Sequence, residues 1–314
     1  MNKKIAIKIL LSAFLMGALI WQVNIRELIS SFKTVNIVML VFVYSTFIPG
    51  VLFSTYKWMV LLRAQQINTP SFFRLWGLYH IGCFFNNFLP TDVGGDLIKS
   101  YTVGKESNKQ TQSLAAVAIE RISGFIAIIL YGIVGTFINI QIAVKLNIVY
   151  IMPTILLLIC IFICLFLNKS LMGWLKKKIS YKRTEKIVNK LSKLYESLCL
   201  YKEKKLILIY VMILSFIFQL YSIWYFFALL KVMAIPFNFV NLMLIVPAIT
   251  IISVIPLTIN SIGLREGAFV FLFSYVGLTS VQALLLAFLY RIGVLLPGIL
   301  GGIIYLFDNT KKMQ

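Results

Sequence analysis

The sequence is poor in charged residues and poorest in acids. Asp and Glu together number 10, against 30 Lys and Arg, and charged residues make up 13% of the 314-residue chain. Soluble domains usually contain about 25% charged residues. This shortage of charge, with 60% hydrophobic residues and a mean hydropathy of +0.93, excludes an ordinary soluble protein and predicts an integral membrane protein.

Histidine is almost absent and cysteine is scarce. The single histidine, His80, cannot by itself form a histidine metal site or serve a catalytic triad in this context, and the four cysteines suggest small buried hydrophobic residues. The sequence contains no Walker loop and no dinucleotide fingerprint. We therefore predict no catalytic residues, no metal, no cofactor and no nucleic-acid partner, although the net charge is +20.

Long apolar runs, in contrast, are abundant. A helix needs about 20 apolar residues to cross the hydrocarbon layer of a bilayer. The first candidate span is short and follows three lysines, as in a signal peptide, but no convincing small-residue cleavage site follows and we expect a retained anchor. The candidate spans are Ile9–Val23, Asn36–Tyr56, Ala115–Asn139, Ile148–Leu167, Leu206–Leu230 and Leu285–Phe307.

Two further apolar regions, Leu75–Pro90 and Leu242–Tyr275, are interrupted by proline, glycine and polar residues. Irregular backbone at membrane depth is tolerated only where protein or a watery cavity satisfies its polar groups. Both regions are candidates for re-entrant or broken helices, and the alternative is an ordinary helix, a tight turn and another helix. The predicted fold is an all-α polytopic membrane protein with about six full spans and two re-entrant or broken segments, or six to eight spans in all.

The distribution of lysine and arginine predicts the orientation, because cytoplasmic loops are enriched in these residues. With both termini in the cytoplasm, most of the 30 Lys and Arg fall on the cytoplasmic side, including Lys57, Lys99 and many between residues 169 and 205. The 169–205 segment has an amphipathic helix pattern with a basic face. It could lie on the anionic inner leaflet, simply follow the charge bias, or dock a partner protein.

Two charged pairs indicate an internal repeat. Shifting the sequence by 170 residues places Glu266 on Asp96 and Arg291 on Arg121. With the orientation above, the matching helices run in opposite directions, as in the inverted repeats of transporters. Within one integral membrane domain, 1–314, we therefore predict inverted repeats at 36–139 and 206–309.

Charged side chains inside apolar helices are costly, about 2.5–3.5 kcal/mol each on insertion scales, and usually have a function. An arginine fork matches a phosphate, carboxylates neutralise the arginines when no ligand is bound, and backbone N–H groups near a glycine turn can also bind phosphate. The alternative is that the charges only stabilise the structure by pairing between helices. The predicted substrate-binding or translocation residues are Asp96, Glu120, Arg121, Arg265, Glu266, Arg291, Gly94, Gly95 and Asn87, with Pro90, Pro256 and Gly263 as gating residues.

Four segments carry a family resemblance: FFNNFLPTDVGGDLIKSY, AIERISG, SIGLREGAFVFL and LYRIGVLLPGILGGIIYL. Together they resemble the flippase-like transmembrane domain of the lysylphosphatidylglycerol synthase/flippase family. The resemblance implies a multi-pass plasma-membrane protein that handles phospholipids or polyprenyl-linked lipids. In two-part members the membrane region moves aminoacylated phosphatidylglycerol, and a cytosolic domain synthesises that lipid. Because the chain ends at Gln314, we expect that domain to be absent here and its role to fall to a possible separate cytosolic enzyme.

The predicted function is therefore a lipid flippase that moves an anionic, aminoacylated or polyprenyl-linked lipid between leaflets, with oligomers possible. Without an ATP site, transport would be downhill or coupled to protons or to the membrane potential. One alternative is a membrane-embedded transferase, in which Asp92 and Asp96 would bind Mg²⁺, or a membrane subunit of a phosphatidylglycerol lysyltransferase system. Another alternative is a transporter of small anions.

Overall fold

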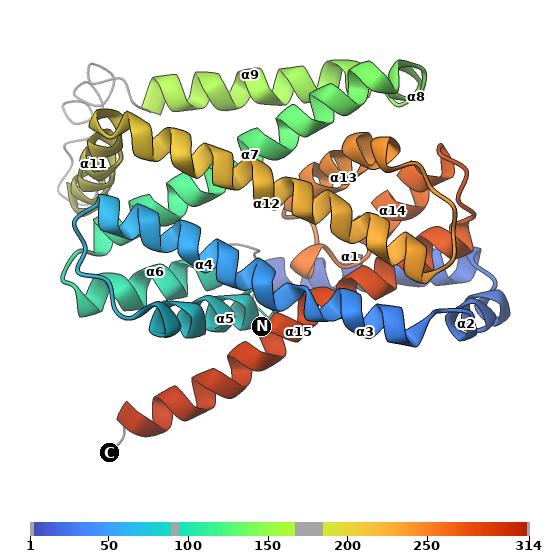
Figure 1. The fold of residues 1–314 in the computed structure, drawn as a ribbon, viewed down its shortest axis with the longest axis horizontal. Coiled ribbons are helices and arrows are strands. Elements are labelled where there is room, and N and C mark those ends of the chain that lie inside the picture. Colours follow the sequence, from blue (N-terminus) through green and yellow to red (C-terminus); the bar gives the residue numbers. More distant parts are fainter. Residues whose placement is uncertain (1–2, 89–93, 167–184, 313–314) are drawn as a thin grey trace.

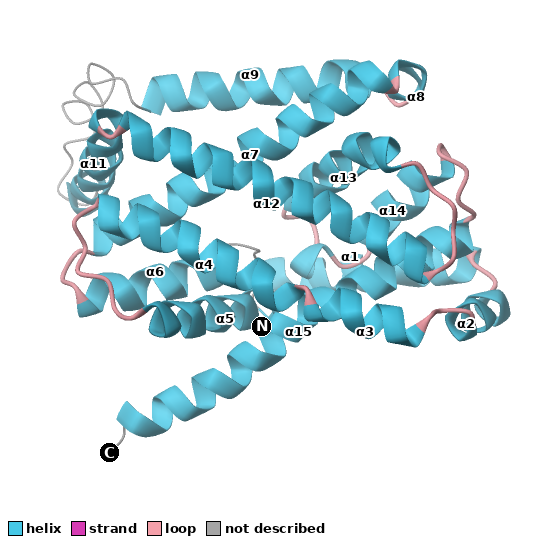
Figure 2. Ribbon diagram, in the orientation of Figure 1, coloured by secondary structure: helices cyan, strands magenta, loops and turns pink. Residues whose placement is uncertain are grey.

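The computed structural model describes residues 3–88, 94–166 and 185–312. In these residues every regular element is a helix, as Figure 2 shows. Five helices are long and apolar enough to cross a membrane, and a sixth span is formed if two helices joined at 82° near the N-terminus count as one. The predicted all-α polytopic membrane class is confirmed.

The spanning helices follow the predicted apolar runs closely, except that two of the runs are bent or broken. The first run forms α1 and then bends sharply into α2, and the second is broken at Thr46 into α3 and α4 and continues to Ala64. The predicted end of the fourth span, Leu167, lies outside the described residues. The spanning elements are α1 (Lys3–Gln22), α2 (Ile25–Lys33), α3 (Ile37–Ser45), α4 (Phe47–Ala64), α7 (Gln110–Ile138), α9 (Ile148–Phe166), α12 (Lys205–Val232) and α15 (Ser280–Lys312) (Figure 1).

The two interrupted regions form helical hairpins, which confirms the prediction of two broken segments. In the first hairpin α5 (Phe72–Phe88) runs antiparallel to α6 (Gly94–Glu106), because Arg74 pairs with Glu106 at one end while Gly82 approaches Gly95 at the other. In the second, α13 (Phe239–Val254) is followed by η2 (Ile259–Ser261) and α14 (Leu264–Ser274).

The tips of the two hairpins meet. The side-chain amide of Asn260, in the second tip, donates to the backbone oxygen of Asn87 at the end of α5, at 3.4 Å. Pro256 lies between α13 and η2, where the chain is not helical, and Gly263 begins α14 with a φ of 81°, a value that favours glycine. Pro90 lies outside the described residues.

Helices of the two halves pack against each other in antiparallel pairs. α4 runs against α12, since Thr46 contacts Tyr221 while Tyr56 contacts Tyr210. α5 packs along α15 and α13 along α7. Glycine permits both of the latter contacts: a Cβ at Gly135 of α7 would lie 2.5 Å from the carbonyl carbon of Met243 on α13.

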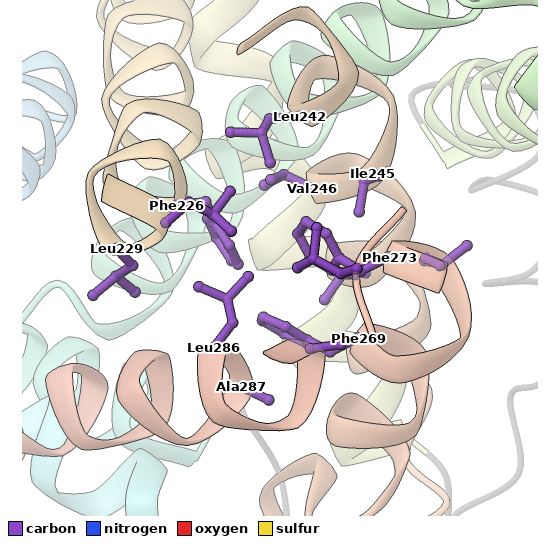
Figure 3. Close-up of a cluster of buried hydrophobic side chains, with 14 of the residues drawn as sticks. Phe226, Leu229, Leu242, Ile245, Val246, Phe269, Phe273, Leu286 and Ala287 are labelled. Atoms are coloured by element: carbon purple, nitrogen blue, oxygen red, sulfur yellow. The ribbon is translucent and has the colours of Figure 1, made fainter. Parts of the chain in front are cut away.

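The larger hydrophobic cluster lies where α12, α13, α14 and α15 converge (Figure 3). Phe226, Phe269 and Phe273 pack there with aliphatic side chains from α13 and α15, and all three phenyl rings are buried. This packing fixes α14 against α15, and thereby positions the charged residues that the two helices carry.

A short helical segment crosses one end of the molecule. α11 (Glu185–Cys199) and η1 (Leu200–Glu203) pack across α4 and α7, and α8 (Ile140–Lys145) lies at the opposite end of α7 (Figure 1). The Tyr201 hydroxyl donates to the carbonyl of Leu61, and Lys204 donates to that of Ala64, so this segment caps the last turn of α4. Lys193 on α11 is exposed, and its contact with an anionic leaflet stays a prediction.

Candidate functional site: two arginine–carboxylate clusters

The first cluster begins with an ion pair between the hairpin and a spanning helix. Asp96 lies in the first turn of α6, and Nε and Nη2 of Arg121 on α7 both lie 2.5 Å from its Oδ2. The aspartate side chain is 4% exposed and the arginine side chain 46% exposed. The carboxylate is therefore fixed inside the protein, while part of the guanidinium remains open.

Lys99 occupies the centre of the same cluster. It lies one turn after Asp96 on the same face of α6, and its Nζ is 3.2 Å from Oδ1 of Asp96 and 3.0 Å from Oε2 of Glu120 on α7. Its side chain is 1% exposed. The ammonium group joins two carboxylates that would otherwise repel each other inside the protein.

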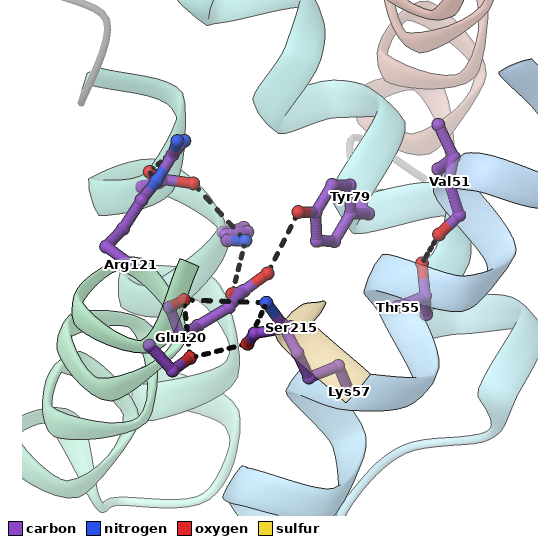
Figure 4. Close-up of polar contacts among 10 residues, drawn as sticks. Val51, Thr55, Lys57, Tyr79, Glu120, Arg121 and Ser215 are labelled. Atoms are coloured by element: carbon purple, nitrogen blue, oxygen red, sulfur yellow. Dashed lines mark hydrogen bonds and ion pairs between the residues drawn. The ribbon is translucent and has the colours of Figure 1, made fainter. Parts of the chain in front are cut away.

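Aromatic and hydroxyl groups complete the first cluster (Figure 4). The hydroxyl of Tyr79 on α5 donates to Oε1 of Glu120 at 2.9 Å, and the Tyr79 ring centroid lies 3.9 Å from Nζ of Lys99. Lys57 on α4 donates to the Glu120 backbone oxygen at 3.5 Å and to Ser215 of α12 at 3.3 Å. Four helices, α4, α5, α7 and α12, thus enclose the charges of α6.

The second cluster repeats the arginine–carboxylate pair. Glu266 lies in the first turn of α14, and its Oε1 is 2.5 Å from Nε of Arg291 on α15. Its Oε2 accepts the backbone N–H of Gly263 at 2.8 Å. The glutamate side chain is 1% exposed and the arginine side chain 16% exposed.

The two arginines of this half have different partners. Arg265 donates through Nε to the Ser253 hydroxyl at 3.1 Å and lies over the Tyr290 ring, 5.8 Å from its centroid. Arg291 donates through Nη1 to the backbone oxygen of Asn260 at 3.4 Å, but its Nη2 is buried without a hydrogen-bond partner. A buried donor without an acceptor is costly, so an acceptor that hydrogen-bonds to this nitrogen would be bound favourably.

The two pairs match in position as well as in chemistry. In each cluster the acid lies in the first turn of a hairpin helix, and the arginine follows it by 25 residues on the next helix. The acid-bearing helices begin at residues 94 and 264 and the arginine-bearing helices at 110 and 280, so both starts differ by 170 residues. The sequence comparison predicts this match, and the extent of the repeats stays a prediction.

The predicted site residues fall into these two groups. Asp96, Glu120 and Arg121 meet in the first cluster, where Lys99 joins the two acids. Glu266 and Arg291 pair in the second, while Arg265 contacts Ser253 and the Tyr290 ring instead. The adjacent residues Glu120 and Arg121 point to different partners, as expected from helix geometry.

The remaining predicted residues lie at the hairpin tips. Gly94 and Gly95 begin α6, and Asn87 ends beside Asn260. The Gly95 N–H, which we expected to be offered to a phosphate, donates to Asn86 Oδ1 at 2.7 Å in this conformation.

Lys99 and Lys57 were missed as site residues, because both were expected in cytoplasmic segments. Both are buried inside the protein, Lys57 within the helical run Ile37–Ala64 and Lys99 in the cluster, and the side of the membrane on which they lie stays a prediction. One signal for Lys99 was available: a position three residues after Asp96 lies on the same helix face. The repeat comparison obscured it, since the residue 170 positions later is the buried Phe269.

The carboxylate pair proposed for a transferase is not supported by the described residues. Both oxygens of Asp96 face cations, Oδ1 toward Lys99 and Oδ2 toward Arg121. Asp92, the other member of that pair, lies outside the described residues. The arrangement of Asp96 therefore fits charge pairing with arginine and lysine.

Comparisons with known proteins agree with the charged motifs. Residues 5–302 match the family model described as lysylphosphatidylglycerol synthase TM region. No curated protein and no solved structure matched the chain. The match extends from α1 into α15 and covers both charged clusters, so the chain belongs to the lysylphosphatidylglycerol synthase transmembrane-region family.

Proposed function

We propose that this protein is a lipid translocase that moves a phospholipid or polyprenyl-linked lipid with an anionic phosphate between the leaflets of the plasma membrane. Membership of the family associates the chain with membrane lipids. The finer assignment comes from the charged clusters, because lipid phosphate is the anion that a membrane-embedded guanidinium group meets most often.

The observation that carries this proposal is the state of Arg291. Its Nη2 is buried without an acceptor, while its Nε pairs with Glu266. A buried donor without an acceptor is costly. A phosphate oxygen would accept from Nη2.

In the proposed mechanism, the headgroup passes between the hairpin tips while the acyl chains remain in the bilayer. Arg121, which is 46% exposed, binds the phosphate first, and the Arg291 cluster receives it from the other half. Asp96 and Glu266 neutralise the arginines between passages. The tips near Pro90 and Pro256 act as gates, and Gly94, Gly95 and Asn87 line the route.

The experiment is leaflet-resolved lipid movement in proteoliposomes. Wild type is compared with Arg291→Ala and Asp96→Ala, using phosphatidylglycerol, its lysyl form and a polyprenyl phosphate. Arg63→Ala is the matched control, since Arg63 is an exposed arginine at the end of α4, outside both clusters. We expect wild type and the control to accelerate movement of at least one lipid, and both cluster variants to lose it.

Two results would contradict the proposal. The first is that wild type moves none of these lipids in vesicles where it is folded and inserted. The second is that Arg291→Ala and Asp96→Ala move lipid as fast as Arg63→Ala, since translocation would then bypass the clusters. A labelled donor lipid, included in the same vesicles, detects transferase activity by its chemical conversion.

A further inference from the structure

The carboxylates of both clusters are held through both oxygens. Asp96 pairs with Arg121 through Oδ2 and with Lys99 through Oδ1. Glu266 pairs with Arg291 through Oε1 and accepts the Gly263 N–H through Oε2. In each cluster one oxygen therefore binds an arginine, and the other binds a group from the hairpin that bears the acid.

The partners on the hairpin are the less mobile ones. The Gly263 N–H is part of the backbone at the start of α14. Lys99 is 1% exposed and is enclosed by the rings of Tyr79 and Trp58, whose centroids lie 3.9 and 5.0 Å from its Nζ. An ammonium held over two aromatic faces and between two carboxylates gains from all four contacts.

The arginine partners are the more accessible ones. Arg121 is 46% exposed while its partner Asp96 is 4% exposed, and Arg291 is 16% exposed while Glu266 is 1% exposed. If an anion withdraws the arginine, the carboxylate stays buried. A buried carboxylate that loses its only counter-charge is strongly destabilised.

We propose that Lys99 is a positioning residue that retains and neutralises Asp96 when Arg121 transfers to the phosphate of the substrate. The Gly263 N–H, which is uncharged, retains Glu266 through a hydrogen bond to Oε2 when Arg291 transfers, so this carboxylate is held without being neutralised. This inference rests on the proposed function and deepens it, because it assigns the mobile role to the arginines and the fixed role to the acids and their hairpin partners.

The consequence can be followed at Arg121. With Lys99 present, Asp96 and Glu120 keep one shared cation after Arg121 leaves. Without it, Arg121 becomes the main counter-charge for Asp96, and a phosphate must compete with a stronger ion pair. Removing both Lys99 and Asp96 eliminates that competition.

The test measures how the initial rate of movement depends on the mole fraction of phosphatidylglycerol in proteoliposomes. The variants are Lys99→Met, Lys99→Arg and the double variant Lys99→Met with Asp96→Asn. The control is Lys231→Met, since Lys231 is an exposed lysine that lies over the Phe227 ring, 5.3 Å from its centroid, outside both clusters. Binding of phosphatidylglycerol to the same proteins in detergent is measured separately by lipid-dependent thermal stabilisation.

We expect Lys99→Met to raise the half-saturating mole fraction about tenfold, because an ion pair in a low-dielectric site strengthens when its competitor is removed. Lys99→Arg keeps the charge and should stay near wild type, as should Lys231→Met. In the detergent binding measurement the double variant should recover wild-type affinity for phosphatidylglycerol, which a purely structural loss of packing would not do. Its lipid movement should be lost, because Asp96 is replaced. If Lys99→Met fails to fold, the double variant alone decides, since it removes one charge of each sign.

Several outcomes overturn the inference and separate it from the proposed function. If wild type moves lipid and Lys99→Met keeps the wild-type half-saturation, or the double variant binds as weakly as Lys99→Met, the retention role is wrong and translocation stands. If phosphatidylglycerol binds in a Lys99-dependent way but does not move, retention stands and translocation is wrong. If wild type neither binds nor moves it, both are wrong. Full displacement by inorganic phosphate would identify a free anion, not a lipid, as the ligand.

Discussion

At the scale of single residues, the chemistry depends on the shape of the guanidinium group. Arg121 contacts one oxygen of Asp96 through Nε and Nη2, and this two-nitrogen edge is the edge that a phosphate would use. Lysine carries the same charge but concentrates it on one nitrogen. The identity of this residue is therefore expected to matter beyond its charge.

For Arg121→Lys we predict a loss of about tenfold in the rate of lipid movement, equivalent to about 1.4 kcal/mol, because one of two parallel hydrogen bonds is lost. The measurement is the initial rate in proteoliposomes, with Arg63→Lys as the matched exchange at an exposed position. An Arg121→Lys protein that works as fast as wild type would show that charge alone suffices.

Tyr79 permits a second test at this scale. Its hydroxyl donates to Glu120, while its ring lies over Lys99, so Tyr79→Phe removes the first contact and keeps the second. We expect the free energy of unfolding to fall by about 1.5–3 kcal/mol, the usual loss for a hydrogen bond to a charged group. Tyr56→Phe, which removes the exposed contact with Tyr210, should change it much less. The free energy of unfolding is measured by denaturation in detergent. If Tyr79→Phe and Tyr56→Phe lower it equally, the hydrogen bond from Tyr79 to Glu120 does not stabilise the protein more than an exposed contact.

At the scale of elements, the hairpins are held by close helix packing. α5 lies so near α15 that a Cβ at Gly301 would overlap the carbonyl oxygen of His80. Because the atom in the way belongs to the backbone, no rotation of a side chain can relieve the overlap. The position of the first hairpin, and hence of Asp96 and Lys99, depends on this contact.

We predict that Gly301→Ala destabilises the protein by about 2 kcal/mol or more, as expected for overpacking against backbone. The matched control is Gly267→Ala on α14, where a Cβ would meet nothing within 4 Å, and where alanine should be neutral or slightly stabilising. Thermal unfolding in one detergent compares the two. A stable Gly301→Ala protein would mean that α5 and α15 can separate without cost.

At the scale of the whole molecule, the two halves are built from similar elements that face in opposite directions. α4 runs antiparallel to α12, α5 packs on α15, and α13 packs on α7, so each hairpin contacts the long helix of the other half. We therefore expect a movement of one hairpin to be transmitted to the half that contains the other, as alternating access between inverted repeats requires.

The orientation with both termini in the cytoplasm stays a prediction from the distribution of lysine and arginine. Six spans, counting α1 and α2 as one, are an even number and agree with termini on one side of the membrane. We expect reporters fused at the C-terminus or inserted after Lys193 to be cytoplasmic, and one inserted after Lys145, in the connection between α8 and α9, to be external. Reporters after Lys145 and Lys193 on the same side would contradict this topology.

The membrane class and most of the helices are predictable from the sequence, because the apolar runs and their lengths depend on local composition. The proline and glycine interruptions likewise mark both broken regions. The bend after α1 and the break at Thr46 were not predicted. At the break, Thr46 contacts Tyr221 of α12, a residue far away in the sequence. Six charged site residues are predictable because they lie in or beside apolar segments, namely Asp96, Glu120, Arg121, Arg265, Glu266 and Arg291, whereas Lys57 and Lys99 of the first cluster are not.

Only the tertiary structure decides how those charges combine. Arg121 pairs with Asp96 instead of with Glu120, its neighbour in the sequence. Lys99 is buried between the carboxylates of Asp96 and Glu120, because folding of the hairpin brings α6 against α7. In the sequence, Lys99 is one lysine in a polar stretch, indistinguishable from those expected in cytoplasmic loops. The sequence by itself determined the membrane class of this chain and pointed to six of its charged site residues, but not to Lys57 and Lys99. The partner of each charge depended on contacts between residues far apart in the chain, which local composition does not encode.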